Sequence, residues 1–177
     1  MMEEILKTEE TADRDAGEET VDRDAGQECS QDRITNPEGA LRAIADAFPL
    51  EEKKVRMYSA LSFAYIGDSV YDLIIRTMFT VKGNMKPNKY HRQVIEYVNA
   101  AAQTRMMEEI KPFLTDEEKV IFRRGRNAKP ESHAKNQSLH DYRIATGFEA
   151  LIGYLYLTGQ MERIMELVTI GLDGIQQ

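Results

Sequence analysis

From Pro37 onward, apolar residues recur at spacings of three and four, a pattern typical of amphipathic helices. No segment shows the strict alternation of a strand, so the sequence predicts an all-α helical bundle. The predicted helices cover residues 37–48, 54–80, 88–110 (as one helix or two), 116–125, 141–157 and 160–172.

Local signals set several of these boundaries. Gly83 and Pro87 break the chain in the turn KGNMKPN, and Gly159 separates the last two helices. Thr115 and Glu118 have the spacing of a capping box, which predicts that a helix starts there and ends near Gly125.

Two of the predicted helices are largely apolar, yet each contains an acidic residue. FAYIGDSVYD (63–72) places Asp68 among residues that a helix buries, and Glu149 is the only charge in ATGFEALIGYLYL (145–157). A buried carboxylate needs a partner, which can be an Arg, a Tyr hydroxyl, a helix N-terminus or a cation. If the two helices pack side by side, both carboxylates converge on one hard cation, and Mg²⁺ prefers oxygen ligands completed by water.

Neighbouring residues bear on this hypothesis. Gly67 and Gly153 would let the two backbones approach closely, although small residues also serve ordinary helix packing. Asp72 lies one turn after Asp68; it would either support the metal site or, as we expect, pair with Arg76 at the next i+4 step.

The charge of the chain is unevenly distributed. The net charge is −7, and residues 1–40 hold thirteen acidic and four basic side chains, so the rest is slightly basic. Residues 1–36 contain the repeat TADRDAGEE, TVDRDAGQE and few large apolar side chains, which predicts a disordered acidic tail. The tail is either an inert extension or a decoy that competes with RNA for a basic surface. Residues 37–177 form the one folded domain that we predict.

Basic residues gather in FRRGRNAKPESHAK, which indicates a phosphate-binding segment if it lies near the acidic site. The cluster consists of Arg123, Arg124, Arg126, Lys129 and Lys135, and Lys86, Lys89 and Arg92 form a weaker second patch. The alternative for both is a solvated charged surface.

Cysteine usage and hydropathy indicate the compartment. Cys29 is the only cysteine, and the chain has neither a signal-peptide pattern nor an apolar run long enough to span a membrane. We therefore expect a cytoplasmic protein with no membrane partner.

The two acid-bearing segments resemble known motifs. LSFAYIGDSVYDL resembles the signature helix of the ribonuclease III family, and TGFEALIGYLYL resembles its later segment D-x-x-E-A-L-[IL]-G-A-[IL]-Y-L. The resemblance is closer to the short Mini-ribonuclease III branch, whose elements are present as Ala64–Ser69, Lys86-Pro87, Arg124–Lys129 and Tyr142–Tyr154. It covers Leu61 to Leu172 and implies a ribonuclease III-like nuclease domain, with no double-stranded RNA-binding domain after it.

The resemblance also implies a set of site residues. Asp68 and Glu149 correspond to the family's catalytic, magnesium-binding acids, whereas Leu61, Ala64 and Thr146 stand where ribonuclease III has further acids. Loss of those ligands leaves the number of metal ions open. The RNA-binding residues implied or inferred are Arg123, Arg124, Arg126, Asn127, Lys129, Lys135, Lys86 and Lys89.

The implied function is that of an Mg²⁺-dependent endoribonuclease that cuts double-stranded RNA and leaves a 5′-phosphate and a 3′-hydroxyl. The resemblance further implies a homodimer that matures the termini of large-subunit (23S) ribosomal RNA, aided by a ribosomal protein. One alternative is a catalytically silent relative that binds ribosomal RNA structurally. Another is an all-helical nucleotide pyrophosphohydrolase, whose typical E-x-x-E pairs are missing from the core motifs.

Overall fold

The computed structural model describes residues 44, 47–48, 50–129 and 138–175. Contacts divide the chain into residues 1–42 and 43–177, and every described residue belongs to the second unit. The predicted tail, residues 1–36, and most of the predicted helix 37–48 lie outside the described residues.

The described part of the chain is helical throughout and contains no strand, which confirms the predicted all-α class. Its elements are α2 (Glu52–Val55), α3 (Ala60–Val81), α4 (Pro87–Val98), α5 (Ala100–Ile110), the 3₁₀ turn η1 (Lys111–Phe113), α6 (Asp116–Arg126), α7 (Leu139–Leu157) and α8 (Met161–Ile175).

Most boundary predictions are confirmed. The capping box is present, because Thr115 accepts from the backbone of Glu118 while the Glu118 side chain accepts from the backbone of Thr115. Asn99 ends α4 and N-caps α5, so residues 88–110 form two helices, and Gly159 adopts a φ of 74° at the turn before α8.

The single helix predicted over residues 54–80 is wrong. The chain leaves helical geometry after α2, and α3 starts only after Ser59, whose hydroxyl accepts a hydrogen bond from the backbone of Ser62 at 3.0 Å. A serine N-cap satisfies a backbone donor that the first turn would otherwise leave unpaired, so a new helix begins there.

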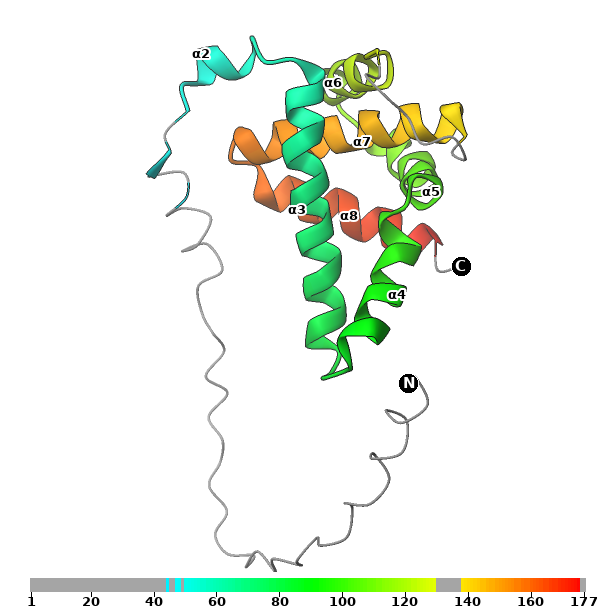
Figure 1. Ribbon diagram of the computed structural model, residues 1–177. Helices are drawn as coiled ribbons and strands as arrows, with labels where there is room; N and C mark the ends of the chain where they lie inside the picture. The colour runs from blue at the N-terminus through cyan, green and yellow to red at the C-terminus, as the bar shows by residue number, and fades with distance from the viewer. Residues whose placement is uncertain (1–43, 45–46, 49, 130–137, 176–177) are drawn as a thin grey trace, which may run out of the picture. The chain divides into compact units, whose positions relative to one another are not determined.

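Helix α7 forms the centre of the fold. It packs against α3, α5, α6 and α8, and Figure 1 shows it crossing α3 steeply near the middle of the domain. Ten of its residues are buried, including Phe148, Leu151 and Ile152 with no exposed surface. The predicted position of this apolar segment in the middle of a bundle is therefore confirmed.

Glycines set the distance between α7 and its neighbours. A Cβ atom on Gly67 would lie 1.9 Å from the carbonyl oxygen of Glu149, and one on Gly153 would lie 2.0 Å from the carbonyl oxygen of Phe63. The backbones of α3 and α7 are thus in direct contact, which is the close approach that the two glycines were expected to permit. Gly125 on α6 meets α7 in the same way, since its Cβ would lie 2.8 Å from the carbonyl oxygen of Thr146.

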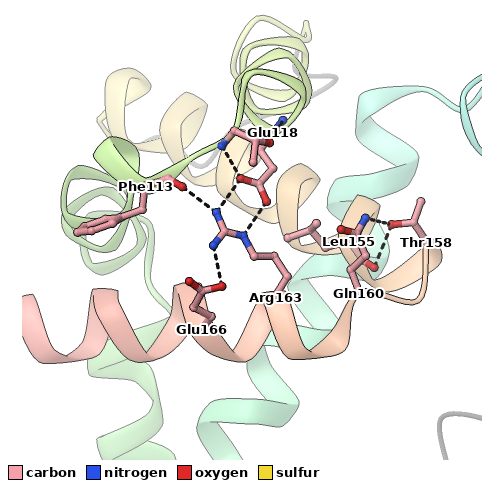
Figure 2. Close-up of polar contacts among 8 residues, drawn as sticks. Phe113, Glu118, Leu155, Thr158, Gln160, Arg163 and Glu166 are labelled. Atoms are coloured by element: carbon pink, nitrogen blue, oxygen red, sulfur yellow. Dashed lines mark hydrogen bonds and ion pairs between the residues drawn. The ribbon is translucent and has the colours of Figure 1, made fainter.

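A buried ion pair joins α6 to α8 (Figure 2). The guanidinium of Arg163 donates to both carboxylate oxygens of Glu118, at 2.9 and 3.0 Å, and to the carbonyl oxygen of Phe113 at 2.7 Å. It also donates to Glu166 at 2.7 Å. Because Glu118 is also the capping-box residue, one carboxylate fixes the start of α6 and attaches α8 to it.

Candidate active site

Asp68 follows the glycine at which α3 touches α7. Successive residues of a helix are rotated by about 100°, so a side chain next to the contact residue points along the edge of the crossing. Asp68 is accordingly exposed, and the expectation that it is buried among apolar residues is wrong. The surrounding protein still excludes enough water to raise the pKa of Asp68, with a smaller contribution from the negative charge of Asp72.

Glu149 lies on α7 at the same crossing and is half-buried. Burial raises its pKa to about 7, and the charge of Asp68 contributes to this rise. A hydrogen bond from the side chain of Gln103 acts in the opposite direction and lowers the pKa. The two acids therefore lie close enough to interact, which is the arrangement expected if both helices contribute to one site.

The chemistry of this pair suits a hard cation. No salt bridge among the described residues involves Asp68 or Glu149, and no basic group contributes to either pKa. Two neighbouring carboxylates without a basic partner supply oxygen ligands and negative charge, and Mg²⁺ commonly binds to one or two carboxylates with water completing its shell. The described residues hold no group of three or more His, Cys, Asp or Glu side chains placed to bind a metal, so the candidate is a two-carboxylate site.

The residues next to the two acids along α3 and α7 have other roles, so the candidate site consists of Asp68 and Glu149. Asp72 accepts a hydrogen bond from Arg76, which confirms the expected i+4 pair. Thr146 is buried and donates to the carbonyl oxygen of Tyr142 in its own helix at 2.9 Å. Ala64 is 5% exposed and belongs to the hydrophobic core.

Gln103 is a residue of the site that the sequence analysis missed. It lies in the first turn of α5, is 1% exposed and is near enough to Glu149 for its side chain to lower the pKa of that carboxyl group. The available signal was an uncharged polar residue on the apolar face that continues through Met106 and Met107.

The candidate RNA-binding residues lie at the end of α6 and the start of α4. Arg123, Arg124, Asn127 and Lys129 are exposed, as are Lys86 and Lys89, whereas Arg126 is half-buried. Arg124 has a structural role as well, because it donates to the carbonyl oxygen of Tyr58 at 2.9 Å and so holds the segment before α3. Lys135 lies outside the described residues.

Helix α3 also carries apolar side chains on its outer surface. Tyr65 is 81% exposed and Leu73 is 59% exposed, while Phe63, Tyr71 and Ile75 of the same helix are fully buried in the core. Positions 65 and 73 are eight residues apart and share one face of the helix with Ser69.

Comparison with known proteins identifies the protein family to which this domain belongs. The ribonuclease III domain family matches residues 61–160, which include both acid-bearing helices. A crystal structure of a protein from Fusobacterium nucleatum has a TM-score of 0.62 and 31% sequence identity, and the match covers 68% of this chain and 96% of that one.

Curated relatives narrow the assignment. Mini-ribonuclease 3 of Enterococcus faecalis is 45% identical over 115 residues, covering 64% of this chain and 87% of the relative. Mini-ribonuclease 3 of Brevibacillus brevis is 48% identical, covering 61% and 81%, and that of Clostridium tetani is 43% identical, covering 69% and 82%. The chain therefore belongs to the Mini-ribonuclease 3 branch of the ribonuclease III family and is an endoribonuclease for double-stranded RNA. The family depends on divalent metal ions and typically forms dimers.

Proposed function

We propose that this endoribonuclease uses Mg²⁺, held by Asp68 and Glu149, to hydrolyse phosphodiester bonds of base-paired precursor ribosomal RNA. The observation that supports the assignment best is the α3–α7 crossing. One carboxylate from each family motif belongs to a helix of this crossing, and the two are close enough that the charge of Asp68 contributes to the raised pKa of Glu149.

The two acids differ in surroundings, so we assign them different tasks. Asp68 is exposed and can meet a bulky polyanionic substrate at the surface. Glu149 is half-buried against Gln103, which restricts the positions that its carboxylate can take. With a pKa of about 7 it also gives up its proton readily when a cation replaces that proton near neutral pH.

The reaction joins a water oxygen to phosphorus and breaks the bond from phosphorus to the 3′ oxygen, which leaves a 5′-phosphate and a 3′-hydroxyl. A bound Mg²⁺ would acidify the attacking water and offset the charge that develops on the phosphate. The histidines of the described residues, His91 and His140, are exposed and lie outside both acid-bearing motifs, so we assign neither a role as base.

RNA recognition is assigned to the exposed basic residues of α6 and α4. An A-form duplex presents phosphates and 2′-hydroxyls across a shallow minor groove, so recognition depends on shape more than on base sequence. Arg123, Lys129 and the partly structural Arg124 supply positive charge at one end of α6, and Lys86 and Lys89 supply it at the start of α4. Lys135 completes the proposed set from outside the described residues.

The exposed face of α3 is proposed as the homodimer interface. Tyr65 and Leu73 expose apolar surface on the helix that carries Asp68, so pairing there would bring two cutting centres together, one for each strand. Leu73→Glu should make the protein monomeric in sedimentation experiments. Met165→Glu, which changes a comparably exposed residue on α8, should leave it dimeric.

The physiological role follows from the family branch. We propose maturation of large-subunit (23S) ribosomal RNA termini in the cytoplasm, assisted by a ribosomal protein bound to the same RNA. Among the described residues no helix is long and apolar enough to cross a membrane. The basic surfaces described above support an RNA partner.

The proposal is tested with a base-paired 23S ribosomal RNA terminus in Mg²⁺, comparing the wild type with Asp68→Asn. We expect the variant to bind the duplex but to cut it at least 100-fold more slowly, because a metal ligand has been lost. Asp72→Asn is the matched control: it removes an acid one turn along α3 that pairs with Arg76, and it should cut within a few-fold of the wild type. Equal cutting by Asp68→Asn would overturn the assignment, and duplex binding without cleavage by the wild type would favour the silent RNA-binding alternative.

A further inference from the structure

Gln103 is a polar residue on a buried and otherwise largely apolar face of α5. It occupies the first turn of α5, beside the buried Ala102 and one turn before Met106, and only 1% of its surface is exposed. Helix α5 packs closely against α7, the helix that carries Glu149. A polar amide is thus enclosed in an otherwise apolar contact between two helices.

The orientation of this amide follows from its two neighbours. The Nε2 group donates to the carbonyl oxygen of Val98 at 3.4 Å, and the side chain lies near enough to the carboxylate of Glu149 to lower the pKa of that group. A carbonyl oxygen and a carboxylate are both acceptors, so the NH₂ group must face them and the amide oxygen must face away. Gln103 therefore presents the NH₂ group of its amide to Glu149.

The amide oxygen is left without a partner. The Oε1 atom of Gln103 is buried and accepts no hydrogen bond in the described part of the protein. An unpaired buried acceptor is destabilising, and an apolar side chain of the same size would avoid it. Packing alone thus gives no reason for glutamine at this position, whereas its hydrogen bond to Glu149 does.

The support behind Gln103 is rigid. Val98 is the last residue of α4, and the next residue, Asn99, donates to the carbonyl oxygen of Ile95 at 2.8 Å and accepts from the backbone of Ala102 at 2.9 Å. The hydroxyl of Tyr71, on α3, donates to the carbonyl oxygen of Tyr97 in the last turn of α4 at 3.2 Å. The end of α4 that holds Gln103 is thereby attached to the helix that carries Asp68.

We propose that Gln103 is a positioning residue of the metal site: it fixes the Glu149 carboxylate from a third helix, so that the carboxylate faces the cation shared with Asp68. The inference rests on the proposed function, because it assigns Gln103 a task only if Asp68 and Glu149 hold a cation. Gln103 itself touches neither the cation nor the RNA.

Gln103→Met in the full chain tests the proposal, because methionine has nearly the same length and volume but donates no hydrogen bond. Binding of Mn²⁺ without RNA, measured by titration calorimetry, should weaken about 10-fold or more, as it does when partners of metal ligands are removed. The Mg²⁺ midpoint for cleavage should rise in parallel, with much of the turnover rate restored at saturating Mg²⁺ and KM for the duplex unchanged. The unfolding temperature in EDTA should stay the same or rise, since the unpaired Oε1 is gone.

Gln93→Met is the matched control. Gln93, on α4, also has a buried Oε1 without a partner, but α4 packs on α3 and α5. This variant should bind Mn²⁺ like the wild type. Gln103→Leu serves as a second variant if Gln103→Met is poorly folded, as judged by its unfolding transition.

The outcomes separate the two proposals. Suppose that the wild-type protein binds Mn²⁺, that Asp68→Asn does not, and that folded Gln103→Met or Gln103→Leu binds it as tightly as the wild type. This result overturns the role of Gln103 and leaves the metal site intact. A wild-type protein that binds no Mn²⁺, or binds it equally well as Asp68→Asn, overturns the metal site and the role of Gln103 with it.

Discussion

Gly67 of α3 lies directly against the carbonyl oxygen of Glu149 on α7, at a separation that leaves no room for a Cβ atom. The residue before one candidate ligand therefore touches the backbone of the other ligand. This contact determines how far apart the two carboxylates are held, and it makes the glycine as important to the site as the acids.

Gly67→Ala should therefore disturb both the fold and the site. The added Cβ would lie 1.9 Å from the Glu149 oxygen and 2.6 Å from the Gly153 nitrogen, and both are backbone atoms that can move only with their helix. We expect a loss of at least about 2 kcal/mol of unfolding free energy in urea titrations, together with a loss of Mg²⁺-dependent cleavage.

Gly174→Ala provides the control for that change. It is also a helical glycine, but the three atoms nearest to its Cβ would all belong to the side chain of Glu109, which is exposed and can move aside. Because alanine favours helix by about 0.5–1 kcal/mol over glycine, stability should be unchanged or slightly higher. Equal stability of Gly67→Ala and Gly174→Ala would show that α3 and α7 are not in backbone contact.

Glu149→Gln should stabilise the metal-free protein at high pH. The pKa of Glu149 rises from its ordinary 4.5 to about 7, so the folded state holds a proton that the unfolded chain releases between these values. Stability associated with this group is present below about pH 4.5 and is lost as the pH rises through 7. In EDTA, the variant should exceed the wild type by about 2 to 3 kcal/mol at pH 8 and by under about 1 kcal/mol at pH 5.

Thermal and urea unfolding at the two pH values measure this difference. Adding Mg²⁺ at pH 8 should stabilise the wild type more than Glu149→Gln, because the cation replaces the proton on the carboxylate. A difference between the two proteins that does not change with pH would contradict the raised pKa.

Glu118→Gln should show the opposite pH dependence. Burial acts to raise the pKa of Glu118, but hydrogen bonds from Arg163 and Thr115 outweigh it and hold the pKa below the ordinary value. Its stabilising contribution is therefore present at neutral pH and is lost as the pH falls through the lowered pKa. The substitution should cost about 2 to 4 kcal/mol at pH 7, since it leaves the Arg163 guanidinium short of its charged partner.

Asp116→Asn is the comparison for Glu118→Gln, because Asp116 lies in the same first turn and forms an exposed ion pair with Lys119 at 3.3 Å. Urea titrations should place this variant within about 0.5 kcal/mol of the wild type. If the two variants were equally stable at pH 7, the attachment of α8 to α6 would not depend on the buried pair.

Arg123→Ala combined with Lys129→Ala should weaken duplex RNA binding in a salt-dependent way. Both side chains are exposed, and Arg124 is left intact because its bond to the Tyr58 carbonyl would confound the result. Each lost phosphate contact should reduce the slope of log affinity against log salt by about 1. Filter binding in the Asp68→Asn background, which we expect to cut slowly, measures the slope. An unchanged slope would assign this end of α6 a role other than RNA contact.

The sequence predicted the helical class and the central position of residues 145–157, and it raised the pairing of the two acid-bearing helices as a condition of the metal site. An apolar segment such as residues 145–157 can be stable only in the middle of a bundle, and glycines at 67 and 153 permit backbone contact there. The exposure of Asp68 was not predicted, since it depends on which face of α3 meets α7. Gly67 determines that face by being the contact residue.

Weaker signals account for the other errors. The break before α3 depends on Ser59 as N-cap, and Ser62 at the third helical position is not the acid that usually marks such a start. Gln103 carries no charge, so only the packing of α5 on α7 reveals that it reaches Glu149.

The contact between α3 and α7 also limits how such a site can change over evolutionary time. Gly67 and Gly153 each face backbone atoms of the opposite helix, so a larger residue at either position cannot be accommodated by a smaller residue at the other. A single substitution at either position would therefore disrupt the contact between α3 and α7 and the site beside it. Variation is expected instead in the exposed basic residues, where a substitution leaves the positions of the two candidate metal ligands unchanged.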